Sequence, residues 1–211
     1  MKVLMLNGSP NKKGCTYTAL TEVGETLKLH DIDYEIFWVG NKPIRDCIAC
    51  RKCNGEGCIF TDDSVNEFLK KSYEADGFVF GTPVYFAHPT GAVQSFLDRV
   101  FLSAGSSDYQ RKAFQFKPAA AVVSARRAGT TASFDVMNKY FTISNMPVVS
   151  STYWNMVHGF TPDDVRQDKE GLQTMRNIGH NMAWMLKCFE LGRQNGIEPK
   201  VEVGEMTHFI R

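Results

Sequence analysis

Short, strand-like runs alternate with longer segments of helical pattern, and this alternation limits the fold more than any other feature of the chain. The strand-like runs occupy residues 3–6, 34–39, 77–81, 118–124 and 148–151. The helical segments occupy residues 16–30, 64–75, 91–103, 133–141 and 170–194. Buried strands separated by crossover-length helices are typical of parallel sheets that helices cover on both sides. The pattern therefore predicts an α/β fold with a parallel sheet.

The chain has the size of one domain and almost no net charge. Its 211 residues include 24 Lys and Arg against 23 Asp and Glu, for a net charge of +1. No linker or composition shift divides it, so we expect a single domain over residues 1–211, with a long C-terminal helix and tail from about residue 170. A neutral surface disfavours nucleic acid and acidic membranes as partners. No apolar run approaches the roughly 20 residues of a membrane span, and the N-terminus does not resemble a signal peptide, so we expect a cytoplasmic protein.

Loops that follow the carboxyl ends of strands are the places where open α/β sheets bind ligands. The first such loop, residues 7–16, is rich in hydroxyl groups and glycine and leads into a helix. Backbone amides at a helix N-terminus favour an anion, so this loop suits a phosphate group. It lacks the Gly-Lys-Ser/Thr ending of a nucleotide P-loop and the G-x-G-x-x-G of a dinucleotide fold. A plain strand-to-helix turn is the alternative.

Two later loops also follow strand ends. Residues 81–91 place two aromatic side chains between prolines, which could wall a pocket for a flat ring or could simply complete the core. Residues 124–131 carry Arg126 and Arg127 beside small residues. These arginines could approach a phosphate or a negatively charged ring, or could belong to a solvated basic turn.

Three motifs together resemble the NAD(P)H-dependent FMN reductases of the flavodoxin-like superfamily. They are Asn7-Gly8-Ser9-Pro10 with Gly14-Cys15-Thr16, the loop Gly81-Thr82-Pro83-Val84-Tyr85-Phe86, and Phe96-Leu97-Asp98-Arg99. The resemblance covers roughly residues 1–155. It implies a flavodoxin-like, five-stranded parallel sheet in the order 2-1-3-4-5, bound FMN, and a homodimer or homotetramer with the flavin near a subunit interface.

The resemblance also implies which residues contact the cofactor. At the phosphate it places Ser9, Asn11, Cys15 and Thr16. At the isoalloxazine ring it places Pro83, Val84, Tyr85 and Phe86. The third loop is usually glycine-rich in this family, and here Arg126 and Gly129 are its candidate contacts. Because FMN carries the chemistry, no catalytic side chain is expected.

Four of the six cysteines lie close together in the sequence. Cys47, Cys50, Cys53 and Cys58 have the spacing C-x2-C-x2-C-x4-C. The tight pitch of the first three suits three corners of a [4Fe–4S] cube, with Cys58 as the fourth ligand. A zinc site of four cysteines normally joins two separate C-x2-C knuckles, which makes zinc less suitable; reduced or disulfide-paired thiols are a further alternative. The block, followed by Asp62 and Asp63, resembles the branch that includes the iron–sulfur flavoproteins.

These features together predict an FMN-dependent oxidoreductase that passes electrons from NAD(P)H through FMN to a small-molecule or protein acceptor. The alternative is a non-enzymatic electron carrier of the flavodoxin type. A carrier that is steered to basic partners would be strongly acidic, so the near-neutral chain favours the enzyme. Tyr153, Trp154 and Met156 follow the last predicted strand, and these residue types are enriched at interface cores. This agrees with the homo-oligomer that the resemblance implies.

Overall fold

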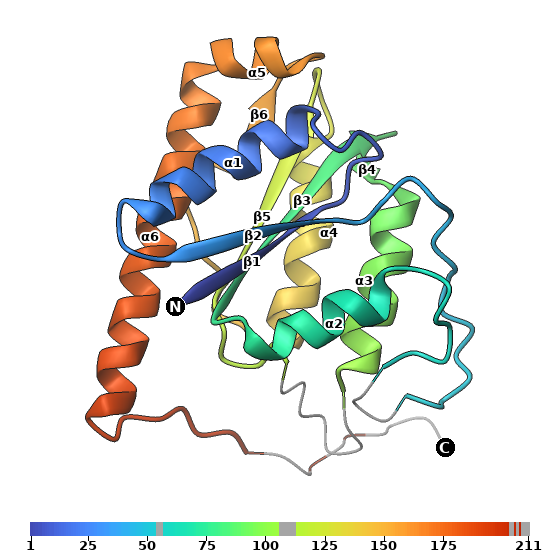
Figure 1. Cartoon of the computed structure of the whole chain (residues 1–211), viewed down its shortest axis with the longest axis vertical. Helices are drawn as coiled ribbons and strands as arrows, with labels where there is room; N and C mark the ends of the chain where they lie inside the picture. The colour runs from blue at the N-terminus through green and yellow to red at the C-terminus, as the bar shows by residue number, and fades with distance from the viewer. Residues whose placement is uncertain (54–56, 106–112, 203–204, 206, 208–211) are drawn as a thin grey trace.

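The computed structural model describes the chain except for residues 54–56, 106–112, 203–204, 206 and 208–211. Its strands are β1 (Lys2–Asn7), β2 (Asp33–Trp38), β3 (Gly77–Tyr85), β4 (His88–Pro89), β5 (Ala119–Ala125) and β6 (Met156–His158). Its helices are α1 (Cys15–Lys28), α2 (Val65–Glu74), α3 (Gly91–Ser103), α4 (Thr130–Ile143), α5 (Pro162–Gln167) and α6 (Lys169–Gln194). The predicted alternation is confirmed, and helices lie on both sides of one sheet (Figure 1).

The sheet has the strand order of flavodoxins. Its hydrogen-bonded order is β2-β1-β3-β5-β6, all parallel, and the short β4 pairs antiparallel with the end of β3. If β4 is left out and the other strands are numbered along the chain, their order across the sheet is 2-1-3-4-5, as expected. The order reverses beside β1, and the carboxyl ends of β1, β3 and β5 therefore form neighbouring positions on one edge.

The two faces of the sheet are buried under different helices. On β1, Val3 and Met5 belong to a core cluster with residues of α1 and α6, whereas Leu4 and Leu6 belong to a cluster with residues of α2, α3 and α4. Successive side chains of a strand point to opposite faces, so an uninterrupted apolar run is what a doubly covered strand requires. This explains why the central strands lack polar alternation.

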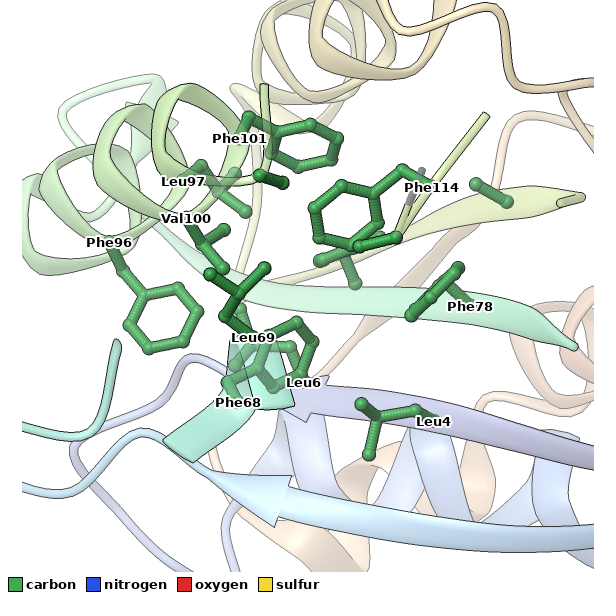
Figure 2. Packing of buried hydrophobic residues seen from close by; sticks show 14 of the residues in the cluster. Leu4, Leu6, Phe68, Leu69, Phe78, Phe96, Leu97, Val100, Phe101 and Phe114 are labelled. Atoms are coloured by element: carbon green, nitrogen blue, oxygen red, sulfur yellow. The ribbon is translucent and has the colours of Figure 1, made fainter. Parts of the chain in front are cut away.

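The face covered by α2, α3 and α4 is rich in phenylalanine (Figure 2). Phe68 of α2 packs edge-to-face on Phe96 of α3 with ring centroids 5.3 Å apart, and Phe78 of β3 packs on Phe114 at 5.1 Å. Aromatic pairs of this kind add about 0.5–1.5 kcal/mol to the effect of area burial. The packing fixes the position of α3, which begins at the end of the loop predicted at residues 81–91.

The last strand differs from the prediction. A strand was expected at residues 148–151, but this stretch makes only an isolated bridge between Val148 and Ala119. Regular pairing resumes at β6, where Met156 lies opposite Val123. The advance of four positions from Ala119 to Val123 on β5 is therefore matched by an advance of eight positions, from Val148 to Met156, on the neighbouring segment. Residues 150–155 consequently bulge out of the sheet. Such an excursion is tolerated because an edge strand pairs on one side only.

Within the described part of the chain, none of the helices combines the length and apolarity needed to cross a membrane.

A partly buried lysine joins the end of α2 to the start of β5. The Lys117 Nζ donates to the carbonyl oxygens of Ser72 at 2.9 Å and Tyr73 at 3.3 Å. It also lies 5.8 Å from the centroid of the Phe78 ring. Carbonyls at a helix C-terminus attract a cation, but loss of hydration outweighs this attraction. Burial lowers the pKa of Lys117 to about 8, against a small opposing effect of Asp76.

The lowered pKa predicts that stability increases with pH in a defined window. Between pH 8 and 10 the folded chain has lost the Lys117 proton, while the unfolded chain, with a pKa near 10.4, still holds it. Lys117 should therefore contribute about 1–2 kcal/mol more to the unfolding free energy at pH 10 than at pH 8, after allowance for solvent screening. Urea unfolding at pH 8 and pH 10 measures this contribution as the difference between the wild type and Lys117→Met. Lys139→Met, on the exposed surface of α4, should change with pH as the wild type does; an equal change with pH in all three proteins would contradict the assignment.

Candidate functional site

Three loops meet at the carboxyl edge of the sheet. The structure narrows the first predicted loop to residues 8–14, the second to residues 82–90 and the third to residues 126–129. The Gly8 amide donates to the Gly81 carbonyl at 2.9 Å, which joins the first loop to the end of β3. Gly129 lies against Ala87 and Val84, which joins the third loop to the second. The structure thus brings together the three segments in which cofactor contacts were predicted.

Side chains outside the predicted contacts hold the first loop in shape. The side-chain Nδ2 of Asn7 donates to the Lys12 carbonyl at 3.0 Å. The side-chain Oδ1 of Asn7 accepts from the backbone amide of Ser9 at 3.2 Å. The Ser9 hydroxyl in turn accepts from the Asn11 amide at 3.1 Å. The Trp38 indole donates to the Ser9 carbonyl at 2.8 Å, so the end of β2 supports the same turn. The loop is therefore preorganised and not a loose connection.

The first loop delivers the N-terminus of α1 to this edge. Gly14 is the N-cap of α1 and provides no side-chain acceptor for the first amides of the helix. The first turn contains no acidic residue, and Lys12 and Lys13 precede it. The leading amides of a helix have no carbonyl partner within it, and the helix dipole adds positive potential there. The site therefore has the chemistry of an anion-binding helix terminus.

The predicted phosphate residues differ in what their side chains touch. Ser9 and Thr16 are buried, Cys15 is half-buried and Asn11 is exposed. The Thr16 hydroxyl shares a hydrogen bond with that of Ser124 at 2.8 Å, so it ties α1 to β5. The Cys15 thiol donates to the Gly159 carbonyl at 3.7 Å, and burial raises its pKa. Cys15 and Thr16 therefore have their side chains engaged in the fold, and it is their backbone amides that face the anion position of a helix N-terminus.

The second loop is a strained β-hairpin. Residues 82–89 were expected to form a loop, but β3 continues to Tyr85, and Tyr85 pairs with His88 across a two-residue turn. The turn residues Phe86 and Ala87 have φ values of 50° and 63°. Two-residue hairpins require this left-handed backbone and favour Asn-Gly for it. Phe86 and Ala87 each hold a conformation that costs of order 1–3 kcal/mol, and the Phe86 ring is fully exposed.

The third loop closes against this hairpin at a glycine. Gly129 has a φ of 96° and is the N-cap of α4. A Cβ atom at this position would lie 2.6 Å from the Ala87 Cα and 2.9 Å from the Val84 Cγ1. Both the backbone conformation and the close approach therefore require glycine. Arg126 and Arg127 remain exposed.

His158, which was not among the predicted contacts, supports the third loop. The His158 Nε2 donates to the Arg127 carbonyl at 3.1 Å, and the His158 amide donates to the Asp168 carboxylate at 2.7 Å. The contact runs to the backbone of the loop and not to an open face. His158 therefore acts in this structure as a support for the loop.

The four clustered cysteines line one small hollow. Cys47, Cys50, Cys53 and Cys58 surround a cavity of about 20 Å³ together with Ile48, Arg51, Phe60, Arg99 and Leu102. Ala49 and Arg51 have φ values of 51° and 57°, so the backbone turns sharply on either side of Cys50. Four cysteines that are spread over twelve positions of the sequence thus line the same hollow.

The four thiols have the chemistry of an iron–sulfur ligand set, but they are not placed as a metal site. Among the described residues, no group of three or more Cys, His, Asp or Glu side chains is placed to hold a metal ion. Four thiolates are the ligands of a four-iron cube, in which each thiolate binds a different iron. The donor set therefore fits such a cube in its chemistry alone.

Three residues of the site were not among the predicted contacts. Asn7 and Trp38 fix the first loop, and Arg99 lies in the wall of the cysteine hollow. Asn7 carries a signal in the sequence, because a polar residue that ends an apolar strand just before a glycine is suited to hold a turn. Nothing in the local sequence around Trp38 or Arg99 indicates their partners, which lie 29 and 41 positions away.

Comparison with known proteins agrees with this geometry. Residues 1–161 match the family model described as NADPH-dependent FMN reductase. An iron–sulfur flavoprotein of Methanocaldococcus jannaschii is 32% identical over 199 residues, which span 90% of this chain and 100% of that protein. An iron–sulfur flavoprotein of Archaeoglobus fulgidus is 38% identical over 99 residues, which span 47% of this chain and 48% of that protein.

Solved structures support the fold. RosB, determined with bound 8-demethyl-8-formylriboflavin-5'-phosphate, superposes with a TM-score of 0.70 at 14% identity and covers 100% of this chain and 92% of its own. An NAD(P)H:quinone oxidoreductase from Methanothermobacter marburgensis superposes with a TM-score of 0.66 at 18% identity and covers 86% of this chain and 96% of its own. The chain therefore belongs to the NADPH-dependent FMN reductase family, in the branch of the iron–sulfur flavoproteins, and is a flavodoxin-like, FMN-binding oxidoreductase.

Proposed function

We propose that the protein accepts electrons from NAD(P)H into bound FMN and passes them to a small-molecule or protein acceptor. The observation that carries the proposal is the meeting of three preorganised loops at the switch point of the sheet, in a chain of this family. Bound FMN supplies a ring that accepts hydride and releases electrons. The protein's part is to bind, orient and shield that ring.

The first loop is the proposed phosphate site. The leading amides of α1, including those of Cys15 and Thr16, provide donors, and Ser9 and Asn11 lie beside Gly14, where the helix begins. Lys12 and Lys13 add positive charge next to the same turn. Donors that are fixed before binding need little reordering when an anion arrives. The loop thus suits the terminal phosphate of FMN.

The second and third loops are the proposed ring site. Pro83, Val84, Tyr85 and Phe86 form one wall, and the Gly129 turn with Arg126 forms the other. The absent Cβ of Gly129 lets the two walls approach. A positively charged arginine near the ring would favour reduction of the flavin, because it stabilises the negative charge that reduction adds.

The proposed hydride transfer is tested by mixing the FMN-loaded protein with NADPH or NADH without oxygen in a stopped-flow instrument. We expect the oxidised flavin absorbance to bleach at a rate that saturates with the concentration of at least one nicotinamide. Dithionite provides the control, since it reduces any accessible flavin. Bleaching by dithionite with no reaction towards either nicotinamide would exclude the enzyme and favour the electron carrier.

We further propose that Cys47, Cys50, Cys53 and Cys58 hold one [4Fe–4S] cluster. The shared hollow of the four thiols supports this, as does the name of the Methanocaldococcus jannaschii relative, whose match covers 90% of this chain. Such a cluster would give the flavin a one-electron partner. Protein purified without oxygen should contain about four iron atoms per chain; near-zero iron would reduce the cysteine block to a structural loop and leave hydride transfer to FMN untouched.

Exposed aromatic side chains near the flavin loops support a homo-oligomer, which we propose as the working state. Phe86 is fully exposed on a strained turn, and Tyr85 beside it is half-exposed. Tyr153 and Trp154, in the bulge before β6, pack edge-to-face at 5.0 Å and are also half-exposed. A second copy that covers the Phe86 ring would offset the cost of the turn, because burying an aromatic ring gains about 1.5–3 kcal/mol.

If the protein is a homo-oligomer that covers Phe86, one substitution there should stabilise the fold and weaken self-association. Phe86→Asn should relax the turn, because asparagine tolerates the left-handed region, and should also weaken self-association by removing the ring. Sedimentation velocity at micromolar concentration should show a dimer or larger for the wild type and a shift towards monomer for the variant. Leu29→Asn, an equally simple loss of an exposed apolar side chain at the end of α1, should behave as the wild type. Wild-type protein that is monomeric with FMN bound would refute the oligomer.

A further inference from the structure

A buried arginine adjoins the cysteine hollow from outside the cysteine loop. Arg99, in the third turn of α3, is 1% exposed. Its guanidinium pairs with the carboxylate of Asp63, whose side chain is 2% exposed. A charge so far from water persists only where it is paired and hydrogen-bonded. Its position therefore needs an explanation beyond the packing of the helix.

The guanidinium is fixed by four groups of the cysteine loop and its ends. The Nε donates to the Cys58 Sγ at 3.3 Å. The Nη1 donates to the Arg45 carbonyl at 3.3 Å and to Asp63, and the Nη2 donates to the Phe60 carbonyl at 3.2 Å. Arg45 precedes the first cysteine, and residues 58–63 include and follow the last one. One side chain on a rigid helix thus clamps both ends of the loop.

We propose that Arg99 is a positioning residue that holds the Cys58 thiolate in place and makes the cluster easier to reduce; this rests on the cluster proposed above. A planar guanidinium has fixed donor directions, so Asp63 and the two carbonyls determine where its Nε points. The Nε donor is thereby aimed at the Cys58 sulfur. Cys58 is the cysteine separated from the other three by the longest spacer, and it therefore has the most to gain from an external clamp.

The effect on reduction follows from charge. One electron, delivered by reduced flavin or by dithionite, makes the cluster one unit more negative, and no proton is required. The Arg99–Asp63 pair is neutral as a whole, but its cationic end contacts the ligating sulfur, so the nearer positive charge and the hydrogen bond both stabilise the more negative state. Water screens this effect little, because the Arg99 and Asp63 side chains are only 1% and 2% exposed. Arg99 should therefore raise the midpoint potential of the cluster.

A second arginine at the same loop provides a matched control. Arg45 lies over the Phe60 ring at 5.1 Å, almost the same separation as the 5.3 Å of Arg99. It also pairs with an aspartate, Asp62, at 3.0 Å, but both side chains are 59% exposed. No contact of its guanidinium with a cysteine sulfur is found among the described residues. The two Arg–Asp pairs thus differ in burial and in contact with the thiols.

The test compares two charge-neutral double variants made without oxygen. Arg99→Gln with Asp63→Asn removes the buried pair and leaves no isolated buried charge behind. Arg45→Gln with Asp62→Asn does the same at the surface. The measurements are iron per FMN and the midpoint potential of the cluster, from a dithionite titration followed by electron paramagnetic resonance. We expect a more negative potential in the first variant alone, with FMN bound in both.

Each outcome bears on the proposal. Equal potentials in the wild type and both variants would overturn it and leave the cluster in place. A wild type without iron would overturn it together with the cluster, while nicotinamide-driven bleaching of FMN would still report on the flavin enzyme separately. If the buried double variant does not retain FMN, Arg99→Lys replaces it, because lysine keeps the charge opposite Asp63 without the fixed fork. A more negative potential in that variant supports the role of Arg99, and an unchanged one overturns it.

Discussion

The parallel pairing of β1, β3 and β5 is the constraint on which the rest of the molecule depends. Parallel strands in register end at the same edge, so the loops that follow them have to meet there. The pairing requires crossover helices, and the two helical layers in turn require strands that are apolar on both faces. The core clusters above and below the sheet satisfy this requirement. The proposed flavin site is therefore a consequence of how the core is built.

Strain in the site is concentrated where the loops meet. Phe86 and Ala87 hold left-handed backbone conformations, and Gly129 lies against Ala87 and Val84. By contrast, the first loop reaches its shape through hydrogen bonds from Asn7 and Trp38 without comparable strain. The proposed phosphate end of the site is thus rigid through polar contacts, whereas the proposed ring end is rigid through close packing. The cysteine hollow follows the same logic, since Arg99 on α3 fixes a loop that has little regular structure of its own.

Periodicity in the sequence was sufficient for the fold but not for the edges of the site. The helix from 91 to 103 and the central strands were predicted to within a few residues, because each has an unbroken apolar pattern. The fifth strand was misplaced, since Val148 and Met156 continue one edge strand across a bulge that leaves no periodic signal. The hairpin at Phe86 and Ala87 was missed because neither residue favours the turn it forms. Long-range partners such as Arg99 and Cys58 are set by tertiary packing, which local sequence cannot reveal.

The contact at Gly129 tests the central claim, that the second and third loops together form the flavin site. Removal of FMN and its re-addition to the apoprotein gives the dissociation constant for the wild type, Gly129→Ala and Gly196→Ala. The two glycines have similar φ values, 96° and 73°, but a Cβ at Gly196 would meet open space. We predict that Gly129→Ala weakens FMN binding at least about tenfold, equivalent to roughly 1.4 kcal/mol, while Gly196→Ala binds as the wild type does. Equal affinity in all three folded proteins would contradict the account.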